Sequence, residues 1–275
     1  MTARPPARVH RLVGALAVVA LALVFGPAAW AAERDDAWPR VRASLFGARI
    51  LADAGDALSL ALPIRAEDAA VVPVAIRAHP APGQARPRRL YLIIDQNPSP
   101  VAAIFEFGEA AGRIEIETRV RVEDYSMVRA IAEYPDGSLA MTTRYIKASG
   151  GCSAPANKGL ADASTLGQMR WTLPEPLIDG RDNLVALLIR HPNTSGLAMD
   201  QVTRLYDPPH FVRHVSVTYQ DRLVLTADVD FSISENPTFR FGLRVAGDGV
   251  LAAEAVDTNE LRFSSSVVLT PVAPR

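Results

Sequence analysis

The sequence predicts an all-β protein of two immunoglobulin-like β-sandwich domains joined by a flexible, cysteine-bearing linker. Short segments rich in valine, isoleucine and leucine recur along the chain, separated by turns of proline, glycine and asparagine. Residues 113–122 alternate strictly, with apolar residues or threonine at even positions and charged residues at odd positions. Such alternation requires one buried and one wet face. We interpret the charged face as a solvated sheet surface and not as a binding patch.

Residues 1–31 have the composition of a cleavable secretory signal peptide. Arg4, Arg8 and Arg11 precede an apolar run over 12–25, and Ala-Trp-Ala at 29–31 fits a small-residue cleavage site. A membrane anchor is the alternative, but a spanning helix needs about 20 apolar residues. We therefore predict a periplasmic protein. Without this segment the net charge falls from −1 to about −4, which argues against nucleic acid or an anionic membrane as partner.

The first predicted domain covers residues 32–149. Asp35-Asp36 can cap a short helix in which Trp38, Val41 and Leu45 share one face. Strands follow, and Pro-Asp-Gly at 135–137 indicates a hairpin between the last two. The predicted strands are 58–62, 71–76, 90–94, 103–107, 113–122, 127–134 and 138–146.

A predicted linker over 150–164 leads into the second predicted domain, residues 165–275. Its phenylalanines alternate along strands and are typical of core packing. Asn97-Pro98 and Asn236-Pro237 occupy similar places in the two domains, and we interpret them as turns. The strands predicted here are 169–173, 184–189, 210–219, 222–229, 238–245, 250–256 and 260–269.

Cys152 is the only cysteine in 275 residues. In an exported protein it is buried and inert, linked to another chain, or a free thiol kept for chemistry. Its flanks, 148–151 and 153–157, contain no bulky apolar side chain, so we expect the thiol to be exposed and mobile. The only lysines, Lys147 and Lys158, flank it. We attribute them to chance, although nearby cations lower a thiol pKa.

Other chemistry finds little support in the sequence. A cysteine hydrolase needs a histidine base near its thiol, and no histidine lies near Cys152 in the chain. His210 and His214 can share one face of a strand and hold a metal with His191, but strand histidines are more often core or surface residues. No Cys-x-x-Cys-His haem motif is present. We predict no enzyme activity, no catalytic residue, no metal and no cofactor.

The ordered motifs resemble those of the SoxYZ sulfur carriers, here as one fused chain. In the first domain the resemblance rests on Val-Pro-Val at 72–74, Asp-Gln-Asn-Pro-Ser-Pro at 95–100 and Gly-Gly-Cys at 150–152. In the second it rests on 188–196, 219–224 and Ile-Ser-Glu-Asn-Pro at 233–237. The SoxY motif continues with two glycines at the C-terminus, whereas here Ser153-Ala154 follow and the chain runs on.

The resemblance implies a carrier that catalyses nothing itself. It places covalent substrate attachment on Cys152 and gives Gly150 and Gly151 the role of swinging-arm hinge. It implies partners among periplasmic sulfur-oxidising enzymes or quinoprotein dehydrogenases, with c-type cytochromes. Fused carriers of this shape resemble a group linked with quinoprotein alcohol dehydrogenases, so the cargo, thiosulfate or another, stays open. The alternative is a non-covalent accessory or maturation protein for a periplasmic quinoprotein (PQQ) alcohol dehydrogenase, in which Cys152 is incidental.

Overall fold

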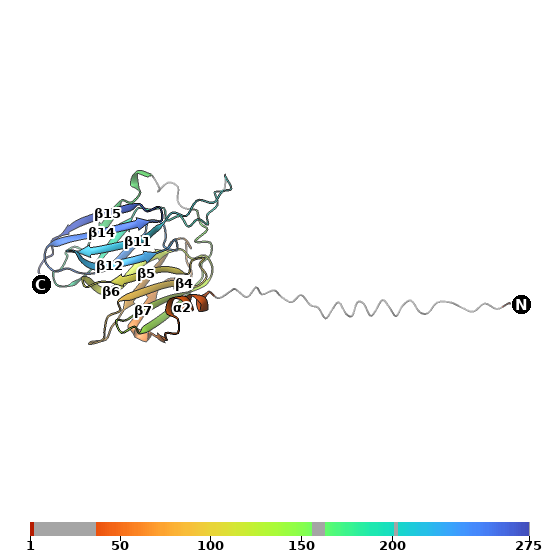
Figure 1. Ribbon diagram of the computed structural model, residues 1–275, viewed down its shortest axis with the longest axis horizontal. Helices are drawn as coiled ribbons and strands as arrows, with labels where there is room; N and C mark the ends of the chain where they lie inside the picture. Colours follow the sequence, from red (N-terminus) through yellow and green to blue (C-terminus); the bar gives the residue numbers. More distant parts are fainter. Residues whose placement is uncertain (3–36, 156–162, 201–202, 275) are drawn as a thin grey trace. The chain divides into compact units, whose positions relative to one another are not determined.

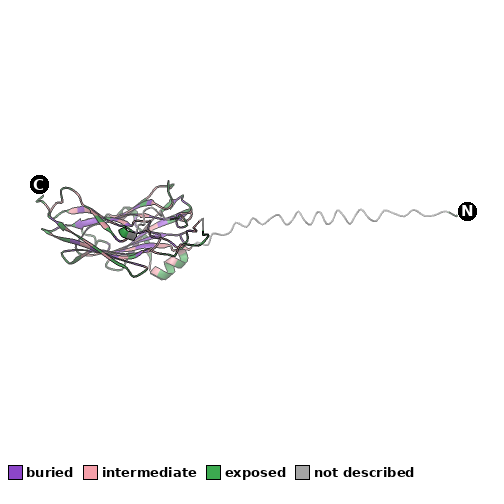
Figure 2. Ribbon diagram, turned by 90° about the horizontal axis from the view of Figure 1, so that it is seen from above, coloured by how far each residue is buried: buried purple, intermediate pink, exposed green. Residues whose placement is uncertain are grey.

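The chain folds into two β-sheets, and successive side chains along each strand point in turn toward the buried layer between the sheets and toward an outer surface. The computed structural model describes residues 1–2, 37–155, 163–200 and 203–274. In β6 (Ala111–Val120), Ile114, Ile116 and Val120 are at most 4% exposed, as the alternation predicts. Figure 2 shows buried residues along the strands between the two layers.

Nine strands form one sheet in the order β1-β8-β7-β4-β5-β12-β11-β14-β15 (Figure 1). Neighbouring strands are antiparallel except β1 and β8, which are parallel. The bounds are β1 Leu51–Asp53, β4 Arg89–Ile94, β5 Val101–Phe107, β7 Ser126–Glu133, β8 Leu139–Ile146, β11 Val212–Tyr219, β12 Arg222–Val229, β14 Gly249–Asp257 and β15 Arg262–Leu269.

Six strands form the second sheet in the order β2-β3-β6-β13-β10-β9. All its neighbours are antiparallel. Besides β6, its strands are β2 Leu58–Ala61, β3 Val72–Ala78, β9 Met169–Thr172, β10 Asp182–Ile189 and β13 Thr238–Arg244. Two short 3-10 helices, η1 (Gly55–Ala57) and η2 (Ala163–Thr165), complete the described elements together with helix α2 (Trp38–Phe46).

The two halves of the chain join edge to edge in both sheets. β5 pairs with β12, and β6 pairs with β13, so each sheet runs from the first half into the second. Phe105 and Phe239, one from each half, pack edge to face at 6.2 Å between ring centroids. The all-β sandwich fold class is confirmed. The 150–164 segment is however not the sole connection, because the halves share two sheets and one apolar core.

Helix α2 (Trp38–Phe46) covers the outer face of the nine-stranded sheet. Phe46 meets Tyr91 edge to face at 5.1 Å, and the Arg129 guanidinium lies 4.1 Å over the Trp38 ring. The predicted apolar face is confirmed, since its members pack against buried residues of β4 and β7. The helix N-cap is Ala37, which makes no side-chain cap bond, whereas the sequence favoured the preceding Asp pair.

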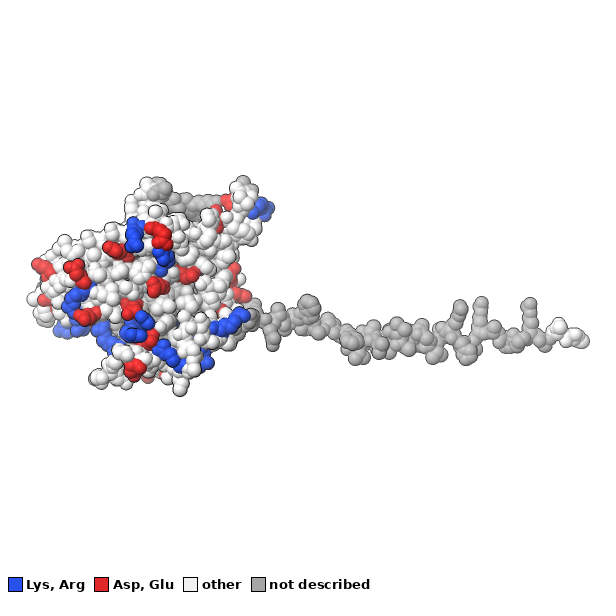
Figure 3. Space-filling view, in the orientation of Figure 1, with Lys and Arg blue, Asp and Glu red and all other residues white. Residues whose placement is uncertain are grey.

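The predicted signal peptide lies outside the described residues. Within the described part of the chain, no helix is long and apolar enough to cross a membrane. On the face in Figure 3, basic and acidic side chains are interspersed and form no single-sign patch. This mixture agrees with the near balance of 29 basic and 30 acidic residues in the sequence.

Candidate functional site

Cys152 lies in a short loop, residues 150–153, which we call the cysteine loop. The loop packs on the residues that follow β6, where Gly150 N–H donates to the Glu123 carbonyl at 2.8 Å and Gly151 N–H donates to the Val122 carbonyl at 3.0 Å. Gly150 has a φ of +79°, which favours glycine. A Cβ on Gly151 would lie 2.1 Å from the Ala69 carbonyl oxygen. Small residues here permit close backbone packing.

The Glu123 carboxylate holds the cysteine loop by three hydrogen bonds. Its Oε2 accepts the Cys152 N–H at 2.8 Å and the Ser153 N–H at 3.1 Å. Its Oε1 accepts the Ser153 hydroxyl at 3.0 Å. Hydrogen bonds to a carboxylate are among the stronger ones in proteins. Glu123 therefore fixes the backbone on both sides of the Cys152 side chain.

The second half of the chain closes over the same loop. Ser195 Oγ donates to the Cys152 carbonyl at 2.5 Å. Arg121, only 2% exposed, donates through Nη1 to the Gly151 carbonyl at 3.4 Å and through Nη2 to the Asn193 carbonyl at 3.1 Å. One buried guanidinium thus ties the cysteine loop to a loop of the second half. The charged face predicted to be solvated is, at Arg121, an interior contact.

Asn97 positions the groups that hold the cysteine loop. Its Oδ1 accepts the Glu123 N–H at 2.9 Å, and its Nδ2 donates to the Arg121 carbonyl at 2.8 Å and to Ser232 Oγ at 2.9 Å. Asn97 is 4% exposed, so each of these bonds satisfies a buried polar group. The sequence pattern indicated only a turn at Asn97. Its position beside the cysteine loop depends on strand pairing that the sequence does not reveal.

The expected exposure of Cys152 is wrong, because the residue is free but fully buried. Burial, followed by the negative charge of Glu123, raises the pKa of the Cys152 thiol to about 12, although the positive charge of Arg121 opposes the rise. The thiol is thus neutral near pH 7. Lys147 precedes the loop as an exposed residue, and Lys158 lies outside the described residues.

A pH dependence follows from this raised pKa. The folded protein retains the thiol proton up to about pH 12, whereas an unfolded cysteine ionises near its ordinary value of 9.0. The stability associated with the neutral thiol is therefore present below pH 9.0 and is lost as the pH rises toward 12. Urea unfolding at about pH 7.5 and about pH 10.5 should show a larger loss for wild type than for Cys152→Ser. Equal losses would contradict a buried, neutral thiol.

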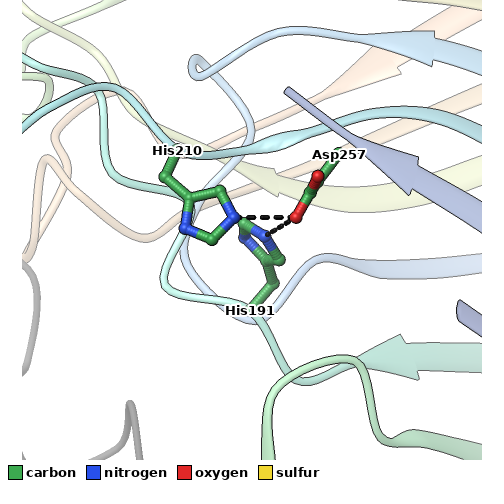
Figure 4. Close-up of side chains that lie close together, drawn as sticks. All are labelled: His191, His210 and Asp257. Carbon is green, nitrogen blue, oxygen red and sulfur yellow. Dashed lines mark hydrogen bonds and ion pairs between the residues drawn. The ribbon is translucent and has the colours of Figure 1, made fainter. Parts of the chain in front are cut away.

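His191, His210 and Asp257 form a compact histidine cluster (Figure 4). Both Nε2 atoms approach the same Asp257 Oδ2, at 3.4 Å from His191 and 2.7 Å from His210. The other oxygen, Oδ1, accepts the N–H groups of Asn259 at 2.8 Å and Leu261 at 2.9 Å. Although burial alone would raise it, these donors hold the pKa of Asp257 below its usual range.

The position of the proton on His191 indicates that the histidine cluster is a hydrogen-bonded network and not a metal site. The Asn193 N–H donates to His191 Nδ1 at 3.0 Å, so a neutral His191 carries its proton on Nε2 and donates it to Asp257. Burial, and then the neighbouring His210, lowers the pKa of His191 to about 4, which keeps the ring neutral. Metal ligation through Nε2 would require loss of that proton or of the Asn193 bond. The ligand atoms lie within 4.8 Å of one another, but the tautomer does not fit a metal.

The sequence analysis grouped His191 with His210 and His214. The structure brings His191 and His210 together, but the third member of the cluster is Asp257 and not His214. His214 is exposed and its Nδ1 lies 2.7 Å from Asp228 Oδ1. No sequence pattern pointed to Asp257, because it reaches the cluster only through the pairing of β14 with β11.

The histidine cluster supports the loop that closes over Cys152. Asn193, whose N–H contacts His191, is fully buried and has a φ of +46°. Its Oδ1 accepts the Val212 N–H and its Nδ2 donates to the Ile233 carbonyl, each at 3.0 Å. These bonds fix Asn193 and, two residues later, Ser195 against the cysteine loop. The cluster is therefore part of the frame of the cysteine site.

Comparison with protein families gives two consecutive matches. The model described as sulfur oxidation protein SoxY matches residues 42–152, and the model described as sulphur oxidation protein SoxZ matches residues 176–268. The chain is a fusion of a SoxY domain and a SoxZ domain. This carrier family is typically non-catalytic and periplasmic, and it implies sulfur-oxidation enzymes as partners. In this chain the SoxY match ends at Cys152. The side chains that hold the cysteine loop come from both domains, Arg121 and Glu123 from the SoxY domain and Ser195 from the SoxZ domain.

Other comparisons add little to the SoxY and SoxZ matches. No curated protein matches the chain. A superoxide reductase (neelaredoxin) from Ignicoccus hospitalis is 12% identical, with 38% of this chain and 80% of that chain covered and a TM-score of 0.29. A β-glucuronidase from glycoside hydrolase family 2 is 11% identical, with 80% of this chain and 21% of that chain covered and a TM-score of 0.23. These likenesses carry no argument about function.

Proposed function

We propose that this protein is a periplasmic covalent carrier that holds a sulfur-containing intermediate on Cys152 and presents it to partner redox enzymes. The observation that carries the proposal is the coincidence of the only cysteine with the end of the SoxY match, in a loop that both domains hold. Seven hydrogen bonds join the backbone of the cysteine loop and the Ser153 hydroxyl to Glu123, Ser195, Arg121 and the Val122 backbone, so both domains fix the position of Cys152. Gly150 and Gly151 are the proposed hinge of the loop.

Loading requires the cysteine loop to open. A thiolate is the nucleophilic form of cysteine, and the buried thiol with a pKa raised to about 12 is not in that form at neutral pH. Once the loop leaves Glu123 and Ser195, the thiol returns toward its ordinary pKa. Joining its sulfur to a cargo thiol forms an S–S bond, releases both S–H protons to water and transfers two electrons to a c-type cytochrome partner. The closed state thus protects the thiol between loading events.

The burial of Cys152 also favours a second candidate function. A buried, neutral cysteine is typical of a structural residue. On this alternative the protein is a non-covalent accessory or maturation protein for a periplasmic quinoprotein (PQQ) alcohol dehydrogenase. It would then bind its partner through its surface, and Cys152 would be incidental.

The mass of the intact protein from its native periplasm separates the two candidates. A carrier is expected to show a species heavier than the unmodified mature chain, with the added mass located on Cys152 by peptide mapping and released by a thiol reductant. The matched control is Cys152→Ser isolated in the same way, which should carry no adduct. A bare thiol throughout, under conditions in which the partner system is active, would overturn the carrier proposal and favour the accessory protein.

A further inference from the structure

A cleft of about 440 Å³ opens on the outer face of the six-stranded sheet, where the two domains meet. Arg119 of β6 contributes from the SoxY domain and Arg190, directly after β10, from the SoxZ domain, while Arg170 lies on β9, the strand that precedes the SoxZ match. Gln168 and Asn236 complete the polar lining, and among the described residues no acidic side chain lines it. We call this the arginine cleft. Three guanidinium groups in one hollow present concentrated positive charge.

Arginines elsewhere on this outer face have acidic partners. Arg240 pairs with Glu117 at 3.1 Å, and Arg244 pairs with Asp182 at 2.8 Å. Over residues 37–155, 163–200 and 203–274, the three arginines of the arginine cleft make no ion pair with a carboxylate. Like charges gathered without counter-charges repel one another, so a bound anion would stabilise this arrangement.

Part of the arginine cleft is already positioned for a ligand. Arg119 Nη2 donates to the Asn236 carbonyl at 3.1 Å and to Thr238 Oγ1 at 3.0 Å, which fixes its planar fork against β13. The Asn236 Oδ1 accepts the His191 N–H at 3.3 Å, so its amide nitrogen is left as a donor. Arg170 and Arg190 are exposed and can turn toward a bound anion.

We propose that the arginine cleft binds a small oxyanion carrying two negative charges. Guanidinium groups match the oxygens of tetrahedral oxyanions in geometry, and each adds a charge-assisted hydrogen bond. The volume of the cleft lies in the range of small-molecule sites, and its lining of arginine and amide side chains suits an anion. Because Arg119 comes from the SoxY domain and Arg190 from the SoxZ domain, the site exists only where a SoxY and a SoxZ domain are paired. The proposal does not depend on Cys152.

Calorimetric titration of the full chain with sulfate at low ionic strength tests the proposal, with sodium chloride as the matched salt. We expect saturable one-site binding for sulfate and none for chloride. Arg170→Gln and Arg190→Gln should each weaken it by about tenfold or more. Arg144→Gln removes the same charge from the other sheet, where the guanidinium donates to the Thr143 carbonyl, and should change affinity less than about twofold.

Three outcomes would overturn the arginine cleft proposal. The first is no saturable sulfate binding, the second is equal weakening by Arg144→Gln, and the third is binding of an acidic peptide such as hexaglutamate without binding of sulfate. Cys152→Ser should bind sulfate as wild type does. Sulfate binding therefore stands or fails separately from the carrier proposal, which the mass of the periplasmic protein tests.

Discussion

Gly151→Ala should destabilise the protein and release the cysteine loop. The added Cβ would lie 2.1 Å from the Ala69 carbonyl oxygen, 2.6 Å from its carbonyl carbon and 2.7 Å from the Val122 nitrogen. All three are backbone atoms, which cannot turn away as a flexible side chain does. Overpacking of this kind costs about 1–3 kcal/mol. For a chain of this size the melting temperature should fall by roughly 2–10 °C.

The matched control for Gly151→Ala is Gly150→Ala. A Cβ at Gly150 meets only Ser153 Oγ at 3.9 Å, but its φ of +79° adds backbone strain of about 1–2 kcal/mol. Gly151→Ala therefore tests the steric clash, and Gly150→Ala tests backbone strain without a clash. Thermal unfolding, together with labelling of Cys152 by a maleimide, gives the readout. A Gly151→Ala protein that melts as wild type does and keeps its thiol unreactive would contradict the close packing of the cysteine loop.

Strand positions could be predicted because their signal is local. The period-two pattern of β6 and the turn before β8 depend only on neighbouring residues. β1 (Leu51–Asp53) was missed, since three residues at a sheet edge carry no periodic signal. The pairing of β5 with β12 and of β6 with β13 was missed for a different reason. It depends on contacts between residues more than 100 positions apart, which one sequence does not reveal.

The same limit explains the error at Cys152. The sequence identified the residue itself, because it is the only cysteine. Small flanking residues suggested mobility, yet in the structure they permit close backbone approach to Ala69. Two side chains that hold the Cys152 backbone, Glu123 and Ser195, are 29 and 43 residues away in the chain. The sequence places Arg121 as the last charged residue of the alternating segment 113–122, but its burial depends on contact with the SoxZ domain.

Replacing the Glu123 carboxylate should have the largest effect on thiol reactivity. Glu123→Gln keeps the size of the side chain but exchanges one acceptor oxygen for an amide donor. The amide oxygen can still accept the N–H groups of Cys152 and Ser153, and the Ser153 hydroxyl can accept from the amide nitrogen, but all three hydrogen bonds lose their charge assistance. Removal of the negative charge also favours the thiolate, because Glu123 helps to raise the Cys152 pKa. The cysteine loop should therefore open more often.

Asp230→Asn separates release of the loop from the effect of charge. Asp230 also raises the Cys152 pKa, but its carboxylate is bonded to Ser99 and to the Phe231 N–H, and no bond from it to the cysteine loop is seen in the described residues. Charge removal alone should increase thiol reactivity by less than about tenfold. In Glu123→Gln, opening of the cysteine loop increases thiol reactivity further, by about tenfold for each 1.4 kcal/mol of lost hydrogen-bond energy.

The rate of maleimide labelling of the folded protein at pH 7 tests most directly whether the cysteine loop holds the Cys152 thiol in a closed, buried state. We predict slow labelling of wild type, labelling of Glu123→Gln faster by about a hundredfold, and an intermediate rate for Asp230→Asn. Unfolded protein labels at the rate of a free cysteine in each case. Rapid labelling of folded wild type, or equal rates in wild type and Glu123→Gln, would contradict the account.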